Sequence, residues 1–353
     1  MIKISLHLES KGKLTPEAYL ETLAENYWKD LNQKINGNYT ENALVSVIEN
    51  YRDQALALDP DYVDKYANND GFISLIQGDF FDCMLENSVS LLKKIIVSEP
   101  AGLESIKAQI KAEFPDEIFF TTSKSTKTQT EFGRLLSEEI FNYRKFRSSK
   151  ICLDYLGNLS FEEVYCPYCG YELLELVEVS PGDTDIPEKA LLDLDHFFSK
   201  AEFPYLSISL FNLIPCCHKC NSRYKLTKEF SITTHVHPYI DSFEDYFTFS
   251  IQTTPGGRRI FVDPVGQNKK DNMVRDLGID KRYKKKKDLL MLETDYNSIS
   301  RYQKNGTIEE FVKYMLKNVP RSRSEILCES FGKAKRDILN SIDVFNVLKP
   351  HIN

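Results

Sequence analysis

Apolar side chains recur every three or four residues over most of the first 120 positions, which is the spacing of one face of an α-helix. Pro16 suits a first helical position, and the stripe behind it predicts a helix through Leu20, Leu23, Tyr27 and Leu31. The same spacing recurs at Leu44/Ile48/Tyr51/Ala55, Val89/Leu92/Ile96 and Leu103/Ile106/Ile110. We therefore expect a mainly helical N-terminal region.

Two stretches of this region depart from the helical spacing. Residues 1–9 interrupt their apolar side chains with Lys, Ser and His at alternate positions, which predicts a strand. Residues 121–130 contain no apolar side chain, so we expect a linker or an exposed loop there. A helix through Leu135 and Ile140 should follow.

Beyond Cys166 the pattern changes to short β elements. The expected elements are strands over 173–179, 191–196 and 210–215, a loop over 180–187, and a helix that follows the Cys217 knuckle and runs through Asn221 and Lys225. Further on, two alternating runs flank Pro255-Gly256-Gly257 and predict a hairpin, and the remainder is expected to be helical. The fold class predicted for the whole chain is α+β.

Length and composition allow two or three folded domains, since the chain has 353 residues of which 42% are hydrophobic. We expect three regions: a mainly helical docking or regulatory region over 1–150, a small module over 151–240, and a hairpin with basic helices over 241–353. No run approaches the roughly 18 apolar residues of a membrane helix, and the N-terminus does not resemble a signal peptide. These features predict a cytoplasmic protein without a membrane partner.

The net charge of −7 is unevenly distributed. Residues 1–150 have 18 basic and 23 acidic side chains, a net charge of −5, and residues 151–240 have 6 and 13, a net charge of −7. Residues 241–353 have 21 basic and 16 acidic side chains, a net charge of +5. A polyanionic partner is therefore expected to bind the C-terminal region.

Five of the eight cysteines lie between Cys166 and Cys220. Two pairs have the C-x-x-C spacing, Cys166 with Cys169 and Cys217 with Cys220, and 47 residues separate the pairs. Each such knuckle can offer two thiolates to one tetrahedral Zn²⁺. The sequence therefore predicts a structural zinc site, with a redox dithiol or buried free thiols as alternatives.

Further polar residues follow the first cysteine pair in a set order. The segments are Cys166-Pro167-Tyr168-Cys169, Asp195-His196, Asn212-Leu213-Ile214-Pro215 and Cys217-His218-Lys219-Cys220-Asn221, with Lys225 behind them. This order, over about residues 166–228, resembles the HNH endonuclease superfamily. The resemblance implies a ββα-metal, treble-clef-like nuclease module over 151–240. Residues 194–200 and 205–213 resemble bacterial phage-defence HNH nucleases, including the nuclease subunit of Septu-type systems.

The resemblance also assigns roles. His196 would be the general base, Asn212 would orient its ring, and Asp195 with the side-chain carbonyl of Asn221 would bind catalytic Mg²⁺ or Mn²⁺. A histidine with a pKa of about 6.5 is largely neutral at cellular pH and can accept a proton from water. Taken singly, these residues could instead be a strand-end turn, a loop turn and a helix cap.

The leading hypothesis is a metal-dependent endonuclease that cleaves DNA as the effector of a bacterial antiviral defence or mobile-element system. The alternatives are RNA cleavage by the same kind of site and a non-catalytic, zinc-dependent nucleic-acid-binding adaptor. The defence-system resemblance implies a partner ATPase.

Candidate substrate contacts come from the basic residues. Six cationic side chains lie within residues 281–287, and we predict that Lys284, Lys285 and Lys286 bind the phosphate backbone. Lys225 is a further candidate near the cysteines. The alternative interpretation of the run is a solvated helix face.

Overall fold

The structure is a computed structural model that describes residues 2–124, 126–177, 189–267, 269–299, 302 and 306–352. The chain folds into two compact units, each assembled from segments distant in the sequence. Unit 1 comprises Met1–Glu17, Leu156–Leu194 and Pro215–Asn353, and unit 2 comprises Ala18–Tyr155 and Asp195–Ile214. The three consecutive regions expected from the sequence are a different division, based on composition and motifs.

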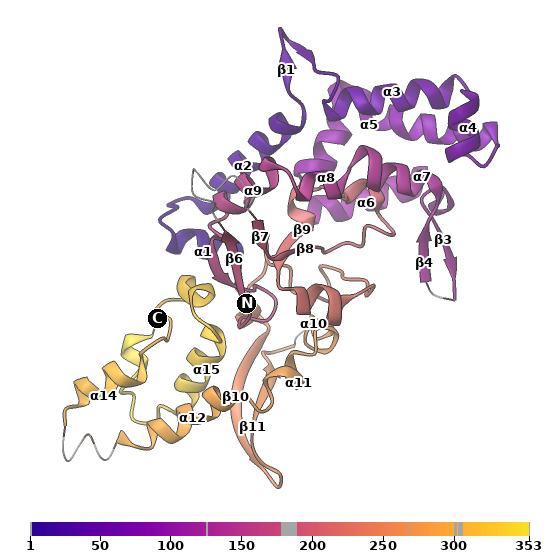
Figure 1. Ribbon diagram of the computed structural model, residues 1–353. Coiled ribbons are helices and arrows are strands. Elements are labelled where there is room, and N and C mark those ends of the chain that lie inside the picture. Colours follow the sequence, from indigo (N-terminus) through magenta and orange to yellow (C-terminus); the bar gives the residue numbers. More distant parts are fainter. Residues whose placement is uncertain are drawn as a thin grey trace. The chain divides into compact units, whose positions relative to one another are not determined.

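Unit 2 is mainly helical. Its helices, two of which extend a few residues into unit 1, are α2 (Pro16–Leu31), α3 (Leu44–Leu56), α4 (Pro60–Tyr66), α5 (Gly71–Val97), α6 (Pro100–Glu113), α7 (Glu131–Arg134), α8 (Tyr143–Arg147) and α9 (Lys150–Asn158). A π-helical turn, Leu135–Ile140, continues α7. α3 lies along α5 (Figure 1). The helices predicted from the apolar stripes are confirmed, except that Val89 lies in a kink of α5 over Glu86–Val89, where the backbone is not helical.

An aromatic cluster holds the segment Asp195–Ile214 in unit 2. The ring of Tyr205, which comes from this segment, lies 5.5 Å from that of Phe119 and 6.0 Å from that of Phe80, centroid to centroid. Phe132 completes the cluster, 6.0 Å from Phe80. All four rings are buried, so apolar burial fixes the segment, although Tyr205 lies more than 70 positions after Phe132 in the sequence.

Residues 121–130 do not form the expected linker or loop. They form most of a hairpin, in which β3 (Phe120–Ser123) pairs antiparallel with β4 (Thr126–Gln129). A second small hairpin joins β1 (Lys34–Ile35) and β2 (Asn38–Tyr39). Threonine favours strands, and most side chains of β3 and β4 are half-buried or exposed. Backbone pairing forms this hairpin without the apolar alternation by which strands are usually predicted.

Unit 1 contains most of the β structure. β5 (Glu163–Tyr165), β6 (Leu173–Val177) and β7 (Lys189–Leu191) form an antiparallel sheet in that order. β8 (Asp193–His196) and β9 (Leu213–Cys216) form a two-stranded sheet, and the chain passes between the units within these two strands. The strand expected over 210–215 therefore begins at Leu213, after a 3₁₀ turn, and the expected loop over 180–187 lies outside the described residues.

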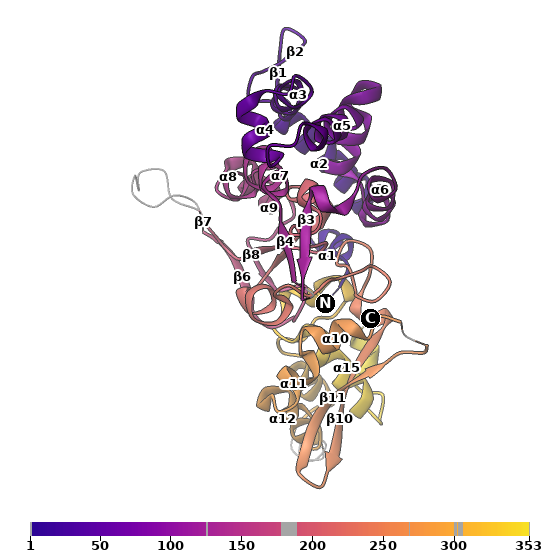
Figure 2. The ribbon, with the colours of Figure 1, turned by 90° about the vertical axis from the view of Figure 1, so that its right-hand side faces the viewer.

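The predicted hairpin around Pro255 is confirmed. β10 (Phe247–Thr254) and β11 (Gly257–Pro264) pair along their full lengths, with Thr254 opposite Gly257. Gly257 has φ of +94°, which glycine adopts without strain. The helices that follow are α10 (Asn272–Asp276), α11 (Ile279–Tyr283), α12 (Lys287–Tyr296), α14 (Ile308–Met315) and α15 (Gly332–Ile342). α15 packs on β10 and on α12 (Figure 2).

The strand expected at the N-terminus is wrong, because residues Ile4–Ser10 form helix α1. Ile4 and Leu8, one helical turn apart, are both fully buried, and Nε2 of His7 on the same face lies 3.0 Å from the carbonyl oxygen of Ser160. Since a carbonyl only accepts, His7 donates. In so short a segment the alternating pattern and the helical pattern coincide, and tertiary packing selects the helix.

Helices and small sheets together confirm the α+β class. In the part of the chain that the structure describes, no helix has both the length and the apolar character needed to cross a membrane.

Candidate metal centre

The two cysteine pairs converge in unit 1, as their spacing predicts. The sulfur atoms of Cys166, Cys169, Cys217 and Cys220 all lie within 4.8 Å of one another, and those of Cys169 and Cys217 are 3.9 Å apart. Zn–S bonds of about 2.3 Å in a tetrahedron place sulfurs about 3.8 Å apart. The four residues therefore form a site that fits a structural metal ion such as zinc. Cys216, although buried beside them, is not one of the four.

Local backbone structure brings each pair together. The first knuckle follows β5, where the amide of Gly170 donates to the carbonyl of Cys166 at 2.7 Å and Gly170 has φ of +69°. The second follows β9, and the amide of Cys220 donates to the sulfur of Cys217 at 3.4 Å. The amide of Cys217 reaches across to the sulfur of Cys166, also at 3.4 Å. The amides of Cys217 and Cys220, which donate to sulfur, stabilise negative charge on it.

Burial opposes the ionisation of these thiols. It raises the pKa of Cys166 well above the ordinary value, and hydrogen bonds with the other three cysteines act in the same direction. Burial also opposes ionisation of Cys169, but hydrogen bonds from the neighbouring thiols and the charge of Arg282 hold its pKa well below the ordinary value. Without a metal ion, the four thiols therefore differ in how readily they ionise. A divalent cation would allow all four to be thiolates.

Arg282 supplies a positive charge to this centre. Its Nη1 donates to the sulfur of Cys220 at 3.2 Å, and Nε donates to the hydroxyl of Tyr171 at 2.6 Å. The guanidinium lies over the rings of Tyr171 and Tyr224, 4.9 and 4.5 Å from their centroids. Burial lowers the pKa of Arg282, but the charges of Cys220 and Cys169 outweigh it and raise the pKa above the ordinary value. The arginine is therefore held as a permanent cation against the thiolates.

Asn221, directly after the second knuckle, contacts an aspartate that the sequence did not single out. Its Nδ2 donates to Oδ2 of Asp193 at 3.0 Å, and Nδ1 of His218 lies 3.2 Å from the same oxygen. Asp193 precedes Asp195 by two residues on β8, so their side chains share a face of the strand. That alternation is the sequence signal by which Asp193 could have been found.

The other predicted catalytic residues, Asp195, His196 and Asn212, belong to unit 2. His196 ends β8, and its Nε2 donates to the carbonyl of Ser207 at 2.9 Å, which leaves the lone pair of the neutral ring on Nδ1. Tyr143 packs edge-on against the ring, with the centroids 4.5 Å apart. Asp195, adjacent to His196, is buried and 3% exposed.

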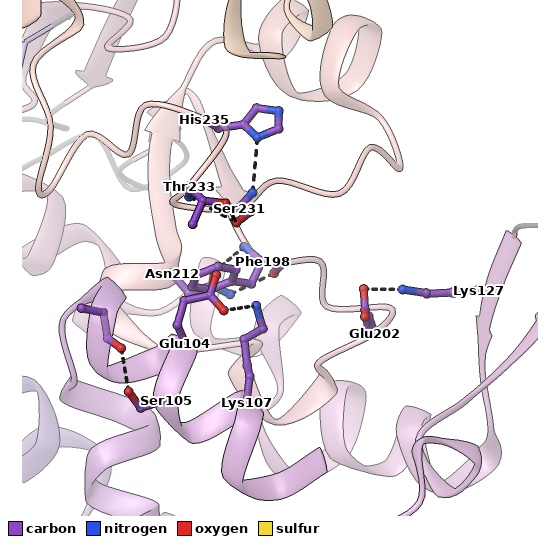
Figure 3. Close-up of polar contacts among 11 residues, drawn as sticks. Glu104, Ser105, Lys107, Lys127, Phe198, Glu202, Asn212, Ser231, Thr233 and His235 are labelled. Carbon is purple, nitrogen blue, oxygen red and sulfur yellow. Dashed lines mark hydrogen bonds and ion pairs between the residues drawn. The ribbon is translucent and has the colours of Figure 1, made fainter. Parts of the chain in front are cut away.

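Asn212 braces the loop that carries Ser207. Its Oδ1 accepts from the amide of Phe198 at 2.7 Å (Figure 3). Its Nδ2 donates to the carbonyls of Phe198 and Leu206, both at 3.1 Å. These bonds act on backbone groups on both sides of the loop. Asn212 therefore holds both the backbone that follows His196 and the loop that carries the Ser207 carbonyl.

The predicted substrate lysines differ in their surroundings. Lys225 is buried, 3% exposed, with its ammonium 4.9 Å from the centroid of Phe230, so phosphate could reach it only if this packing opened. Lys284 and Lys285 are exposed, whereas Lys286 is half-buried and lies over the rings of Tyr171 and Phe331. Two of the six cations in the run, Arg282 and Lys286, thus contribute to packing in unit 1.

Comparison with known proteins gives a distant similarity. The chain is similar to protein ea31 of Escherichia phage lambda, with 27% identity over 177 residues. The similarity covers 44% of this chain and 54% of the phage protein, so the chain spans about half the length of this relative. No family model matches the chain, and no solved structure matches it.

We expect Cys169→Ala to lose most of the bound zinc, because three thiolates bind the ion far less tightly than four. Hydrogen exchange should then increase around both knuckles and stay unchanged in α3 and α5 of unit 2. Cys216→Ala is the matched control, since it removes a buried thiol beside the cluster. A full equivalent of zinc in purified Cys169→Ala would contradict the four-cysteine site.

We also expect Arg282→Met to release zinc more readily to a chromophoric chelator. The substitution removes the charge and the N–H donor at Cys220, and changes outside the ligand set typically cost about tenfold to a hundredfold in metal affinity. Arg275→Met is the control, because Arg275 is exposed and pairs with Asp276. Equal zinc loss from the two variants would show that Arg282 has no specific role.

Proposed function

We propose that the protein is a metal-dependent HNH endonuclease that hydrolyses phosphodiester bonds, with DNA as the favoured substrate. The main support for the proposal is that the two cysteine knuckles meet at one site. The resemblance to HNH nucleases requires them to meet, although 47 residues separate the two pairs in the sequence. Asn221 follows the second knuckle directly, where the resemblance places a metal-binding side chain.

Phosphodiester hydrolysis requires a positioned water, a base to deprotonate it, and positive charge beside the phosphate. His196 is the proposed base, and the contact with Ser207 supports the role because it places the basic lone pair on Nδ1. Asp195 and Asn221 are the proposed ligands of catalytic Mg²⁺ or Mn²⁺, which would stabilise the leaving oxygen. The zinc-type centre would act on structure alone.

The resemblance to phage-defence nucleases extends the proposal to an effector of bacterial antiviral defence that works with a partner ATPase. The relative from phage lambda does not bear on this point, since its name states no activity. The exposed lysines of residues 281–287 are the proposed contact with the nucleic-acid backbone.

We expect His196→Ala to lower the cleavage rate by about a hundredfold or more, which is the usual contribution of a general base. Zinc content and thermal stability should change little, because His196 lies outside the cysteine cluster. His351→Ala, at an exposed position, is the control. The assay uses DNA and RNA of matched sequence with added Mg²⁺ or Mn²⁺. Cleavage by His196→Ala at the parent rate would refute the assigned base, and binding without cleavage by the parent protein would favour the adaptor.

Replacing the exposed Lys281, Lys284 and Lys285 by Gln should weaken DNA binding and flatten its salt dependence. On duplex DNA, the slope of log affinity against log salt changes by about 0.9 for each phosphate that the protein no longer neutralises. The control is the triple Gln variant of Lys313, Lys317 and Lys349, which removes the same charge from exposed positions of unit 1. If both triple variants bind alike, the run 281–287 is a solvated surface.

A further inference from the structure

The cluster at Asp193 brings together three side chains of metal-binding type within unit 1. They are one carboxylate, the imidazole of His218 and the amide of Asn221. We infer that Asp193, His218 and Asn221 together hold a divalent cation of the Mn²⁺ class. The inference rests on the proposed function, since Asn221 is also a proposed ligand of the catalytic ion.

The spacing of the three groups suits a common cation. Oδ2 of Asp193 lies 3.2 Å from Nδ1 of His218 and 3.0 Å from Nδ2 of Asn221. Ligand atoms about 2.1 Å from an octahedral cation are about 3.0 Å apart at adjacent positions. A flip of the Asn221 amide exchanges its nitrogen for its carbonyl oxygen, which is the atom that would bind the ion. With this flip, both neighbours of the Asp193 carboxylate are ligand atoms at the spacing of adjacent coordination positions.

Both sides of the cluster are anchored in the fold. On β8, Asp193 stands between Leu192 and Leu194, which are 6% and 2% exposed. His218 lies inside the second knuckle, and the amide of Asn221 donates to the carbonyl of Cys217 at 3.2 Å. The backbone of the second knuckle therefore positions Cys217 and Cys220 for one metal ion. It also positions His218 and Asn221 for another. Loss of the cysteine-bound metal should also weaken the second site.

The cluster is accessible to solvent and to a phosphate group. The side chain of Asp193 is 29% exposed and that of His218 is 68% exposed. Three protein ligands would leave coordination positions for water and for a phosphate oxygen. An imidazole nitrogen in the ligand set suits Mn²⁺ better than Mg²⁺, which prefers oxygen ligands and retains its water. Mn²⁺ should therefore bind more tightly than Mg²⁺.

The test titrates the zinc-loaded full chain with Mn²⁺ and measures free Mn²⁺ by electron paramagnetic resonance. We expect one Mn²⁺ per chain, bound about tenfold or more weakly in Asp193→Asn and in His218→Gln. Glu172→Gln is the matched control, because its carboxylate is 27% exposed and pairs with Lys219 of the same knuckle. Zinc content and melting temperature establish that each variant is folded.

Pulsed measurements on bound Mn²⁺ give a direct signature. A nitrogen coupling typical of a bound imidazole should be present in the parent protein and in His196→Ala, and absent from His218→Gln. Unchanged Mn²⁺ affinity in Asp193→Asn and His218→Gln would overturn the inference. If Asp195→Asn alone lost Mn²⁺, the proposed nuclease function would stand without Asp193. If Asp193→Asn lost Mn²⁺ but the parent cleaved neither DNA nor RNA, the cation site would stand and the nuclease function would fall.

Discussion

Four cysteine sulfurs buried together cannot all carry negative charge unless a cation joins them, and the two knuckles of unit 1 are organised around this constraint. Burial and hydrogen bonds with the other three cysteines raise the pKa of Cys166, while hydrogen bonds from the neighbouring thiols and the charge of Arg282 hold that of Cys169 low against the effect of burial. A divalent ion resolves the imbalance by binding all four. The ion would then fix the backbone of both knuckles, and with it the residues that lie within and after them. The metal centre would thereby position His218 and Asn221.

The basic segment shows that basic residues with a packing role can look like a phosphate-binding run when only the sequence is known. Residues 281–287 have the composition of a phosphate-binding track, yet Arg282 faces Cys220 and Lys286 lies over Tyr171. Arg282 balances the charge of Cys220, which lies more than 60 positions earlier in the sequence, and Lys286 packs on a tyrosine beside the first knuckle. The exposed lysines of the run remain available to a polyanion, so the segment serves two purposes under the proposed function.

Sequence patterns predicted the elements that depend on repeated apolar spacing, such as α2 and α3, and the hairpin of β10 and β11. They also predicted the cysteine centre, because C-x-x-C spacing reflects the geometry of one ion. They failed at α1, where nine residues fit two periods, and at the hairpin of β3 and β4, which backbone pairing forms with little burial. The contact between Asp193 and Asn221 could not be predicted, since it appears only when β8 and the second knuckle come together.

The most direct test of the central claim is X-ray absorption spectroscopy at the zinc edge on the purified full chain. A four-cysteine centre predicts one zinc per chain, surrounded by four sulfur atoms at about 2.3 Å and no nitrogen or oxygen ligand. A folded protein without stoichiometric zinc, or a zinc with an imidazole among its ligands, would contradict the claim that the four cysteines form the centre on which unit 1 depends.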